Sequence, residues 1–438
     1  MSLLRDDQRL THNSYYAATA LRAQVYPPLQ SDLECDVAVV GGGLAGVSAA
    51  IELADRGYDV VLLEAQQVGW GASGRNGGQA IAGLACDQEV IEKQLGSEAS
   101  RRVWAMTMEA LRLIGERRER FAIECDWRPG FLSLAVSERK GRGLQAWQAH
   151  MAQAYGYATE WIAPNQMAQW IASPRFHSGL HDPLGGHLHP LKYSMGLAQA
   201  AAGLGVRIHE GSAVLGIEPG LTARLRTATG SVRASHVLLA GNVYLNGIAP
   251  MLAKRSMPVG TYVVASEQLD PALADSLIPS QAAACDTNFV LDYFRPTVDH
   301  RMLYGGRVSY STATPANLSA SMHERMVRTF PQLARAKVEF AWGGFVDISM
   351  NRAPDFGRLP DAGAPREYAN VYYLQGFSGH GLALTGLAGR LVAEAIAGDA
   401  ERFDTFARIR HRPFPGGRFL RTPALVAGMA YYRLRDML

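Results

Sequence analysis

The chain has 438 residues, of which 48% are hydrophobic and only 19% are charged. This composition excludes a disordered protein, and the length predicts about three domain-sized units. Forty-three basic and 40 acidic residues give a net charge of +3, which provides no general basic surface, so we expect no nucleic-acid partner.

Cysteine placement and the N-terminal sequence indicate a cellular location. The cysteines form no C-x-x-C pair, which excludes a zinc ribbon, a disulfide scaffold and a thioredoxin-type site; they are Cys35, Cys86, Cys125 and Cys285. We expect free thiols in a reducing, cytoplasmic environment. The start of the chain is polar, without the apolar core of a signal peptide. The apolar stretch 37–54 is interrupted by glycines and Glu52, so we expect no transmembrane segment.

The first elements along the chain form a βαβ unit. Residues 35–40 are a short apolar run typical of a strand, residues 47–56 follow a helical pattern that ends at Gly57, and residues 58–65 form a second buried strand. Two strands joined by a helix within about 30 residues predict a parallel sheet.

The later elements predict a second kind of sheet. The pattern indicates a helix at 101–121 and a strand at 130–137. A second helix, followed by strands and turns, is expected over 195–240. Residues 256–310 alternate between apolar and polar, and residues 371–398 read as a strand, a glycine turn and a helix. The alternating region is typical of an antiparallel sheet with one packed face. Because the two sheet types are interleaved along the chain, we expect two domains threaded through each other.

The glycines Gly41, Gly43 and Gly46 match a dinucleotide fingerprint. The first permits a tight turn, the second lets a pyrophosphate approach the backbone, and the third lets helix and strand pack closely. The phosphates then lie at a helix N-terminus. Glu64 ends the second strand, where a carboxylate can bind a ribose diol, and its charge disfavours the 2′-phosphate of NADP.

Three further segments favour FAD over NAD. The small-residue stretch 67–79 can follow an extended cofactor, residues 376–381 (GFSGHG) precede a helix whose N-terminus suits the flavin oxygens, and Ala240-Gly241-Asn242 ends another strand. The predicted cofactor-binding residues are Gly41, Gly43, Leu44, Ala45, Gly46, Glu64, Ala65, Gly71, Ala72, Ser73, Arg75, Asn76, Gly77, Gly78, Gln79, Val214, Ala240, Gly241, Gly376, Ser378, Gly379, His380 and Gly381.

These motifs resemble the D-amino-acid oxidase superfamily of FAD enzymes, the group with glycine oxidase and sarcosine oxidase. The resemblance rests on GGGLAG, GASGRNGGQ, LLAGN, YFRPTVDHRMLYGGR and YLQGFSGHG. It implies an α/β fold, with a Rossmann-like FAD-binding domain and a mostly antiparallel substrate domain. We expect the first at 31–120, 186–255 and 343–400, the second at 121–185 and 256–342, an N-terminal arm at 1–30 and a C-terminal tail at 401–438.

The resemblance implies oxidation of an amine C–N bond, with hydride transfer to the flavin and hydrolysis of the imine to an aldehyde and ammonia. The partners are then a small-molecule amine and an electron acceptor, either oxygen or another. Segments such as CDWRPGFL and GGHLHPL are similar to a bacterial subgroup that oxidises gamma-glutamylputrescine. A small amino acid (glycine, sarcosine or proline) is the alternative substrate class, and a non-enzymatic FAD-binding protein is an alternative of a different kind.

Candidate catalytic residues follow from the expected position of the flavin. Arg75, Asn76 and His380 lie in the loops expected at the ring, with structural roles as the alternative. Tyr293 flanks a strand of the substrate domain. Arg295 and Arg307 are candidate cations for a remote carboxylate, with core packing or a surface salt bridge as the alternative.

Residues 342–358 depart from the family pattern. Amino-acid-oxidising relatives place an arginine about five residues before the aspartate that matches Asp355; by that count the position holds Met350, with Arg352 nearby. A methionine leaves an α-carboxylate unpaired, which favours an amine whose carboxylate is distant. No cysteine occurs between residues 286 and 438, and Leu382-Ala383 replaces the lysine of sarcosine oxidase relatives. Because the cysteine is absent, we expect FAD to be bound non-covalently. Because the lysine is absent, the way in which sarcosine oxidase relatives activate oxygen cannot be carried over to this chain.

Three further features have mainly structural interpretations. His177, His181, His187 and His189 allow metal binding by spacing, but we expect a histidine-rich loop and no metal. Tryptophans such as Trp104 are expected to supply core area. The tail at 413–438 is expected to dock as a helix, with contact to a membrane surface as the alternative.

Overall fold

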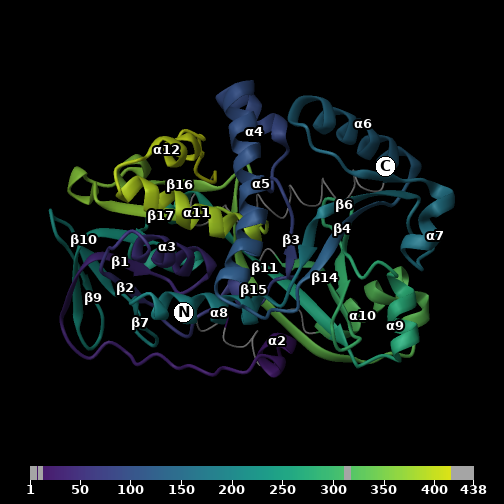
Figure 1. Cartoon of the computed structure of the whole chain (residues 1–438), viewed down its shortest axis with the longest axis horizontal. Coiled ribbons are helices and arrows are strands. Elements are labelled where there is room, and N and C mark those ends of the chain that lie inside the picture. The colour runs from purple at the N-terminus through teal and green to yellow at the C-terminus, as the bar shows by residue number, and fades with distance from the viewer. Residues whose placement is uncertain (1–6, 8–12, 310–316, 416–438) are drawn as a thin grey trace.

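The computed structural model describes residue 7, residues 13–309 and residues 317–415. It has two lobes, each built on its own sheet, with the long helix α5 (Ser97–Arg120) between them (Figure 1). The predicted helix at 101–121 and the two predicted classes of sheet are therefore confirmed.

The first sheet is mostly parallel. Its central strand β1 (Leu33–Val40) pairs in parallel with β2 (Val60–Leu63) and β10 (Ser231–Leu239). The β2 residues VVLL are all buried, as expected for a strand covered on both faces. The remaining strands are β7 (Arg207–His209) and β17 (Val371–Gln375), which are parallel to their neighbours, and β16 (Asp355–Arg358), β9 (Ala223–Arg226) and β8 (Gly216–Glu218), which are antiparallel.

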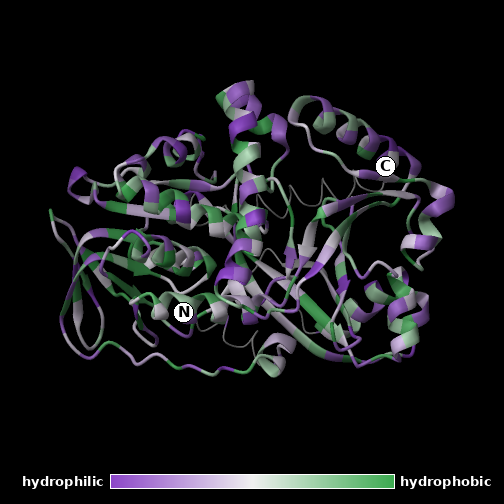
Figure 2. Ribbon diagram, in the orientation of Figure 1, coloured by the Kyte–Doolittle hydropathy of each residue, from purple (hydrophilic) through white to green (hydrophobic). Residues whose placement is uncertain are grey.

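Two apolar helices pack closely in this lobe. They are α3 (Leu44–Ala54) and α11 (Gly381–Ile396). A Cβ at Gly389 of α11 would lie 2.5 Å from the backbone nitrogen of Ala49, so only glycine permits this approach. Figure 2 shows hydrophobic colour along these helices and the first sheet. Helices α8 (Pro190–Gly203) and α12 (Glu401–Ala407) complete the lobe.

The second sheet is almost wholly antiparallel. Its strand order is β15-β11-β14-β13-β12-β4-β6-β3, with β5 added beside β6. Among the strands that the structure describes, β12 and β4 form its single parallel pair. The strands are β15 (Val338–Ser349), β11 (Ser256–Ser266), β14 (Met302–Ser309), β13 (Tyr293–Pro296), β12 (Ala283–Asp286), β4 (Arg128–Ala135), β6 (Ser178–His187), β3 (Gln79–Ala80) and β5 (Glu160–Ile162).

Short and outer helices cover this second sheet (Figure 1). They are α6 (Glu138–Tyr155), α7 (Met167–Trp170), α9 (Pro271–Leu277) and α10 (Leu318–Thr329). Helix α4 (Gln88–Leu95) packs against α5 instead. The N-terminal arm carries α2 (Tyr15–Thr19), whose two buried tyrosines pack against Val263, Leu303 and Trp342 of the second sheet.

Two strands cross the domain boundaries expected from the sequence, and a third, β3, lies inside a segment expected for the FAD-binding domain although it pairs in the second sheet. The boundary at residue 343 falls inside β15, which pairs with β11 up to Ser349. Strand β3 and the last residues of β6 also belong to the second sheet. The reason is that backbone pairing continues along a strand until a turn interrupts it, whereas the sequence boundary followed the motifs.

Within the residues that the structure describes, no single helix is long and apolar enough to cross a membrane. Helices α11 and α12 meet the length and composition criteria only as a pair bent by 118°. Most residues of α11 are buried against the rest of the lobe. The tail beyond residue 415 lies outside the described residues, so its expected helix and its membrane alternative stay predictions.

Candidate active site

The glycine turn after β1 has the geometry of a phosphate site. Gly41 has φ of +114°, and a Cβ at Gly46 would lie 2.0 Å from the Gly41 carbonyl oxygen, so both positions require glycine. The backbone nitrogen of Leu44, at the start of α3, donates to Ser73 Oγ at 2.9 Å. The loop after β2 therefore lies directly against the helix N-terminus, where an anion is favoured.

Glu64 is held at the end of β2 by main-chain donors. Its Oε2 accepts from the Gly42 nitrogen at 2.6 Å and its Oε1 from the Gln66 nitrogen at 2.8 Å. Burial, the largest influence, raises its pKa above the ordinary value. The side chain lines the cavity next to Ala65, as expected for a ribose ligand.

One cavity of about 1380 Å³ runs from this turn across both lobes. Because single ligands usually occupy roughly 300–1,000 Å³, it has room for a cofactor and a substrate. Most predicted cofactor-binding residues line it: Gly41, Gly43, Leu44, Ala45, Glu64, Ala65, Gly71, Ala72, Ser73, Arg75, Asn76, Gly77, Gln79, Val214, Ala240, Gly241, Ser378, Gly379, His380 and Gly381.

Three predicted glycines lie behind the lining instead. Gly46 packs on the Gly41 carbonyl, a Cβ at Gly78 would lie 2.2 Å from the Leu188 carbonyl oxygen, and one at Gly376 would lie 3.0 Å from the Asp355 nitrogen. Their absence of a side chain permits close backbone packing rather than contact with a ligand.

Arg75 lines the cavity, but its charge is already compensated. Its Nη1 forms an ion pair with buried Asp7 at 3.0 Å, its Nε donates to the Trp70 carbonyl, and its guanidinium lies 4.2 Å from the centre of the Trp70 ring. Asp7 also accepts a hydrogen bond from the Tyr244 hydroxyl. No motif or spacing marks this N-terminal carboxylate. A catalytic role for Arg75 stays a prediction.

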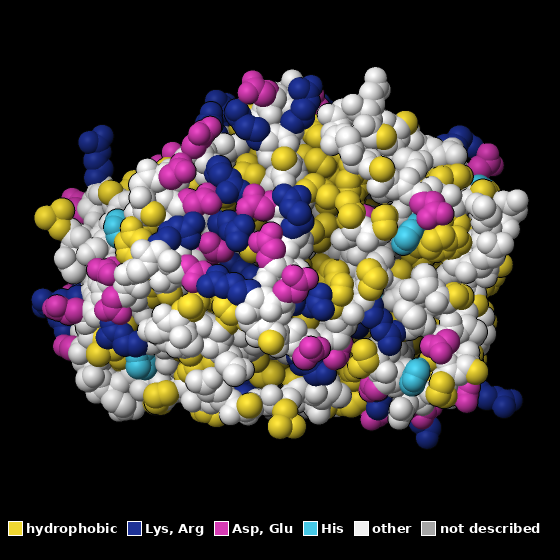
Figure 3. All heavy atoms as spheres, viewed as in Figure 1, with side chains coloured by type: hydrophobic (Ala, Val, Ile, Leu, Met, Phe, Trp, Pro, Cys, Tyr) yellow, Lys and Arg dark blue, Asp and Glu magenta, His cyan; other side chains and the backbone are white. Residues whose placement is uncertain are grey.

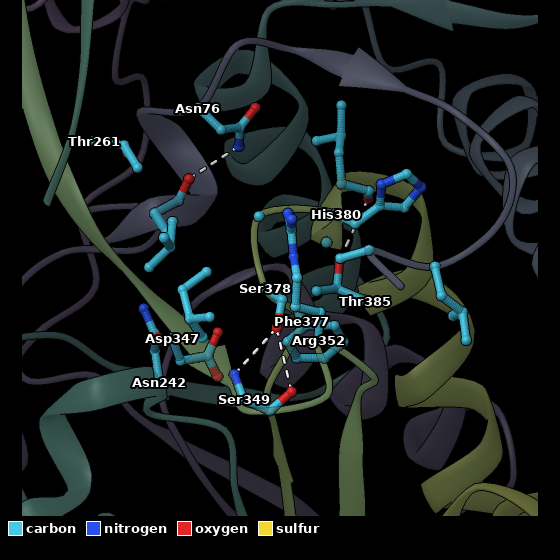
Figure 4. Close-up of a pocket in the computed structure, with 18 of the residues that line it drawn as sticks. Asn76, Asn242, Thr261, Asp347, Ser349, Arg352, Phe377, Ser378, His380 and Thr385 are labelled. Atoms are coloured by element: carbon cyan, nitrogen blue, oxygen red, sulfur yellow. Dashed lines mark hydrogen bonds between the residues drawn. The ribbon is translucent and has the colours of Figure 1, made fainter. Parts of the chain in front are cut away.

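Asn76 stabilises its own loop. Its Nδ2 donates to the carbonyls of Ala72 and Ser73 at 2.9 and 3.0 Å, and its Oδ1 accepts from the Gly78 nitrogen at 2.8 Å. Figure 4 draws Asn76 and Thr261 on one side of the cavity and His380 and Thr385 on the other. Asn76 is thus placed to shape the loop that would face the flavin.

Asp347 holds the second glycine-rich loop and was missed by sequence reasoning. Its carboxylate accepts from the Gly376 nitrogen, and its carbonyl accepts from the Ser378 nitrogen at 3.0 Å. The Ser378 hydroxyl in turn accepts from the Ser349 nitrogen at 3.2 Å (Figure 4). Burial raises the pKa of Asp347 to about 7. The only sequence signal was an acidic residue within an otherwise apolar strand, FVDIS.

His380 and the two candidates after β15 line the same cavity. The Nε2 of His380 lies 3.1 Å from the Ala82 carbonyl oxygen, and burial lowers its pKa, so the neutral ring donates from Nε2. Met350 is 46% exposed. Arg352 has φ of +59°, and its guanidinium lies 5.7 Å from the centre of the Phe289 ring.

The structure decides between the two interpretations of Arg295 in favour of internal packing. Its side chain is buried outside the cavity lining. Nε donates to the Gly77 carbonyl at 2.8 Å, and Nη2 donates to Tyr16 Oη at 3.0 Å and the Leu188 carbonyl at 3.1 Å. It connects the second sheet to the flavin loop and offers no cation to a substrate. Arg307 lies in β14, and its side chain is outside the described residues.

Tyr293 does line the cavity. A Cβ at Gly77 or at Gly305 would lie 2.7 or 2.1 Å from atoms of its ring, so two glycines make room for it. The ring thus touches the flavin loop from the substrate side.

The four histidines do not converge. His187 and His189 are buried, and burial lowers the pKa of each to about 3, while His181 lies 3.2 Å from Glu160. Among the described residues, no group of three or more His, Cys, Asp or Glu side chains could hold a metal ion.

The far end of the cavity is aromatic. Trp104 supplies buried core area there as expected, in a cluster with Met151 and Tyr157, and it also lines the cavity. Trp104, Trp147 and Tyr157 line it together with Asp182. Figure 3 shows hydrophobic side chains gathered in the hollow between α5 and α6. The first and last of these residues are 78 positions apart in the sequence, and no motif connects them.

The cavity residues fit FAD. A Cβ at Gly43 would lie 2.8 Å from Ser73 Oγ, so glycine leaves the backbone open at the helix N-terminus. Two buried polar atoms at the lining, Arg75 Nη2 and Asn242 Oδ1, have no hydrogen-bond partner among the described residues. A polar cofactor can satisfy such atoms.

A turn of this geometry, a terminal acid on β2 and a second glycine-rich helix start define a dinucleotide flavoprotein. The chain belongs to the FAD dependent oxidoreductase (DAO) family, whose model matches residues 36–395. It is therefore an FAD-dependent oxidoreductase acting on amine or amino-acid donors.

Among its relatives, gamma-glutamylputrescine oxidoreductase of Escherichia coli (strain K12) is 44% identical over 427 residues, 97% of this chain and 98% of the relative. Probable oxidoreductase OrdL of Haemophilus influenzae is 37% identical over 97% of each chain. A glycine oxidase of Geobacillus kaustophilus is 24% identical over 86% of this chain and 97% of its own.

Solved structures share the fold. The crystal structure of glycine oxidase from Geobacillus kaustophilus superposes with a TM-score of 0.69 at 21% identity, covering 83% of this chain and 95% of its own. L-proline dehydrogenase from P. horikoshii gives 0.68 at 21% identity, over 84% and 94%. The predicted α/β fold, with one Rossmann-like and one mostly antiparallel sheet, is confirmed.

Proposed function

We propose that this chain oxidises the primary amine of gamma-glutamylputrescine, or of a related glutamylated polyamine, to an aldehyde and ammonia. The observation that carries the proposal is the 44% identity to the Escherichia coli relative along 97% of this chain, against 24% to a glycine oxidase. The cavity supports it, because its volume and aromatic far end suit a long substrate.

Different residues along the cavity would hold the cofactor, fix the loops and orient the substrate. When bound, FAD supplies the two-electron acceptor. The turn at 41–46 and Glu64 would hold its phosphates and ribose, while Asn76 and Asp347 keep the two glycine-rich loops in place. Tyr293 limits the space beside the flavin loop and so orients the reacting carbon. The aromatic end offers apolar surface to the substrate chain.

Substrate choice is tested by an anaerobic screen that follows loss of oxidised-flavin absorbance. A contact to the charged glutamyl head contributes about 1.5–3 kcal/mol, so gamma-glutamylputrescine should reduce the flavin at least about tenfold faster than putrescine, glycine, sarcosine or proline. Equal or faster reduction by a small amino acid would instead favour the second candidate, for which Arg352 at the cavity is the supporting observation.

We also propose that FAD is bound without a covalent bond. Two cysteines line the cavity, but burial raises the pKa of the Cys285 thiol to about 12 and that of Cys86 to about 11, so reactive thiolate is scarce. Acid or heat should release free FAD into the supernatant. Flavin that stays with the denatured chain would contradict this.

The four free cysteines also support a cytoplasmic location, which cell fractionation tests.

A further inference from the structure

Cross-strand register builds one wall of the cavity beyond the flavin loop. Tyr293 on β13 lies opposite Cys285 on β12, Cys285 lies opposite Ser133 on β4, and Ser133 lies opposite Leu180 on β6. Side chains two positions apart on a strand share a face, so Asp182 continues this wall beside Leu180. All five residues line the cavity.

Asp182 is a carboxylate at the aromatic end of this wall. It is 8% exposed, its Oδ1 accepts from the Leu184 nitrogen at 2.9 Å, and its Oδ2 accepts from the Tyr157 hydroxyl. Among the residues that the structure describes, no cation forms an ion pair with it. A buried carboxylate without a counter-charge is unfavourable unless a ligand supplies one.

The rings around Asp182 suit the same ligand. Tyr157 meets Trp104 edge-on, with ring centres 5.0 Å apart, and Trp147 at 6.2 Å. Aromatic rings attract cations such as ammonium groups. Thr159 also lines this end, and its buried Oγ1 has no hydrogen-bond partner among the described residues.

We propose that Asp182, with Trp104 and Tyr157, forms a subsite for a second ammonium group of the substrate, remote from the bond that is oxidised. Given the function proposed above, on which this assignment rests, that group is the α-ammonium of the gamma-glutamyl head. The subsite replaces Arg295 as the element that recognises the head.

The span of the wall fits such a substrate. From β13 to β6 there are three strand spacings of roughly 4.8 Å, or about 14 Å in all. Nine bonds separate the reacting carbon of gamma-glutamylputrescine from its α-nitrogen, and at about 3.8 Å per three extended bonds they reach about 11 Å. Side chains that project into the cavity cover the difference.

The test uses two analogues that lack the oxidisable amine, so binding is measured without turnover. Gamma-glutamylbutylamine carries the α-ammonium, and glutarylbutylamine is the same molecule without it. In calorimetry with the FAD-loaded enzyme, the first should bind at least about tenfold more tightly. Asp182→Asn should abolish this preference, and Tyr157→Phe, which keeps the ring, should reduce it.

The matched control is Glu160→Gln. Glu160 lies on β5 opposite His181, on the other face of the sheet, with its side chain 63% exposed. This variant should keep the full preference. Equal binding of the two analogues by the unaltered enzyme, or a preference that survives Asp182→Asn, would overturn the subsite. A clear preference without oxidation of gamma-glutamylputrescine would leave the subsite in place and remove the proposed function.

Discussion

The two lobes build their parts of the cavity by different means. At the first sheet the lining consists largely of main-chain groups at glycine turns, such as Gly41 and Gly379, and a few residues adjacent in sequence make each turn. At the second sheet the lining consists of side chains from separate strands, brought into one row by register. Cofactor binding thus depends on local backbone geometry, and substrate binding on long-range pairing.

The largest expected effect comes from filling the glycine turn. Gly46→Val should abolish folding or FAD binding, because its Cβ would lie 2.0 Å from the Gly41 carbonyl oxygen, a backbone atom that cannot move cheaply. The measurement is flavin content per chain together with a thermal melt. Gly115→Ala is the control: nothing lies within 4 Å of it inside α5, so it should stabilise the protein by about 0.5–1 kcal/mol. A folded, yellow Gly46→Val protein would disprove the backbone argument.

The next effect tests the connection between the lobes. Arg295→Lys loses the planar fork that contacts the Gly77 and Leu188 carbonyls and Tyr16. We expect a loss of about 3 kcal/mol in the free energy of unfolding, read from urea titrations, and weaker FAD binding. Arg226→Lys, at an exposed pair with Glu218, should change stability by less than about 1 kcal/mol. If Arg295→Lys changed KM and left the free energy of unfolding unchanged, Arg295 would have a role in substrate binding instead.

A smaller effect concerns pH and the second loop. Burial raises the pKa of Asp347 in the folded protein to about 7, from 3.8. Between about pH 4 and 7 the native state therefore holds a proton that the unfolded state has released, and stability falls as pH rises, by up to about 1.4 kcal/mol per unit. Asp347→Asn should remove this contribution, so its unfolding free energy should fall less between pH 5 and 8. Parallel pH profiles for the two proteins would argue against it.

Much of the cofactor half could be predicted because its signals are local. The spacing of Gly41, Gly43 and Gly46, followed by an acid at the end of the next strand, specifies a strand, turn and helix without information from elsewhere in the chain. The second loop at 376–381 was found in the same way. Apolar strands and alternating strands also distinguish the two sheets.

The remaining features were decided by tertiary structure. Asp7 meets Arg75 across 68 positions, Arg295 reaches Gly77 across 218, and Asp182 closes a wall that begins at Tyr293. None of these partners is marked by spacing, since strand order and register determine which distant side chains share a face. The sequence by itself determined the cofactor class and both sheet types. Only the folded chain decided which charges are compensated internally and which remain for a substrate, because that depends on three-dimensional neighbours.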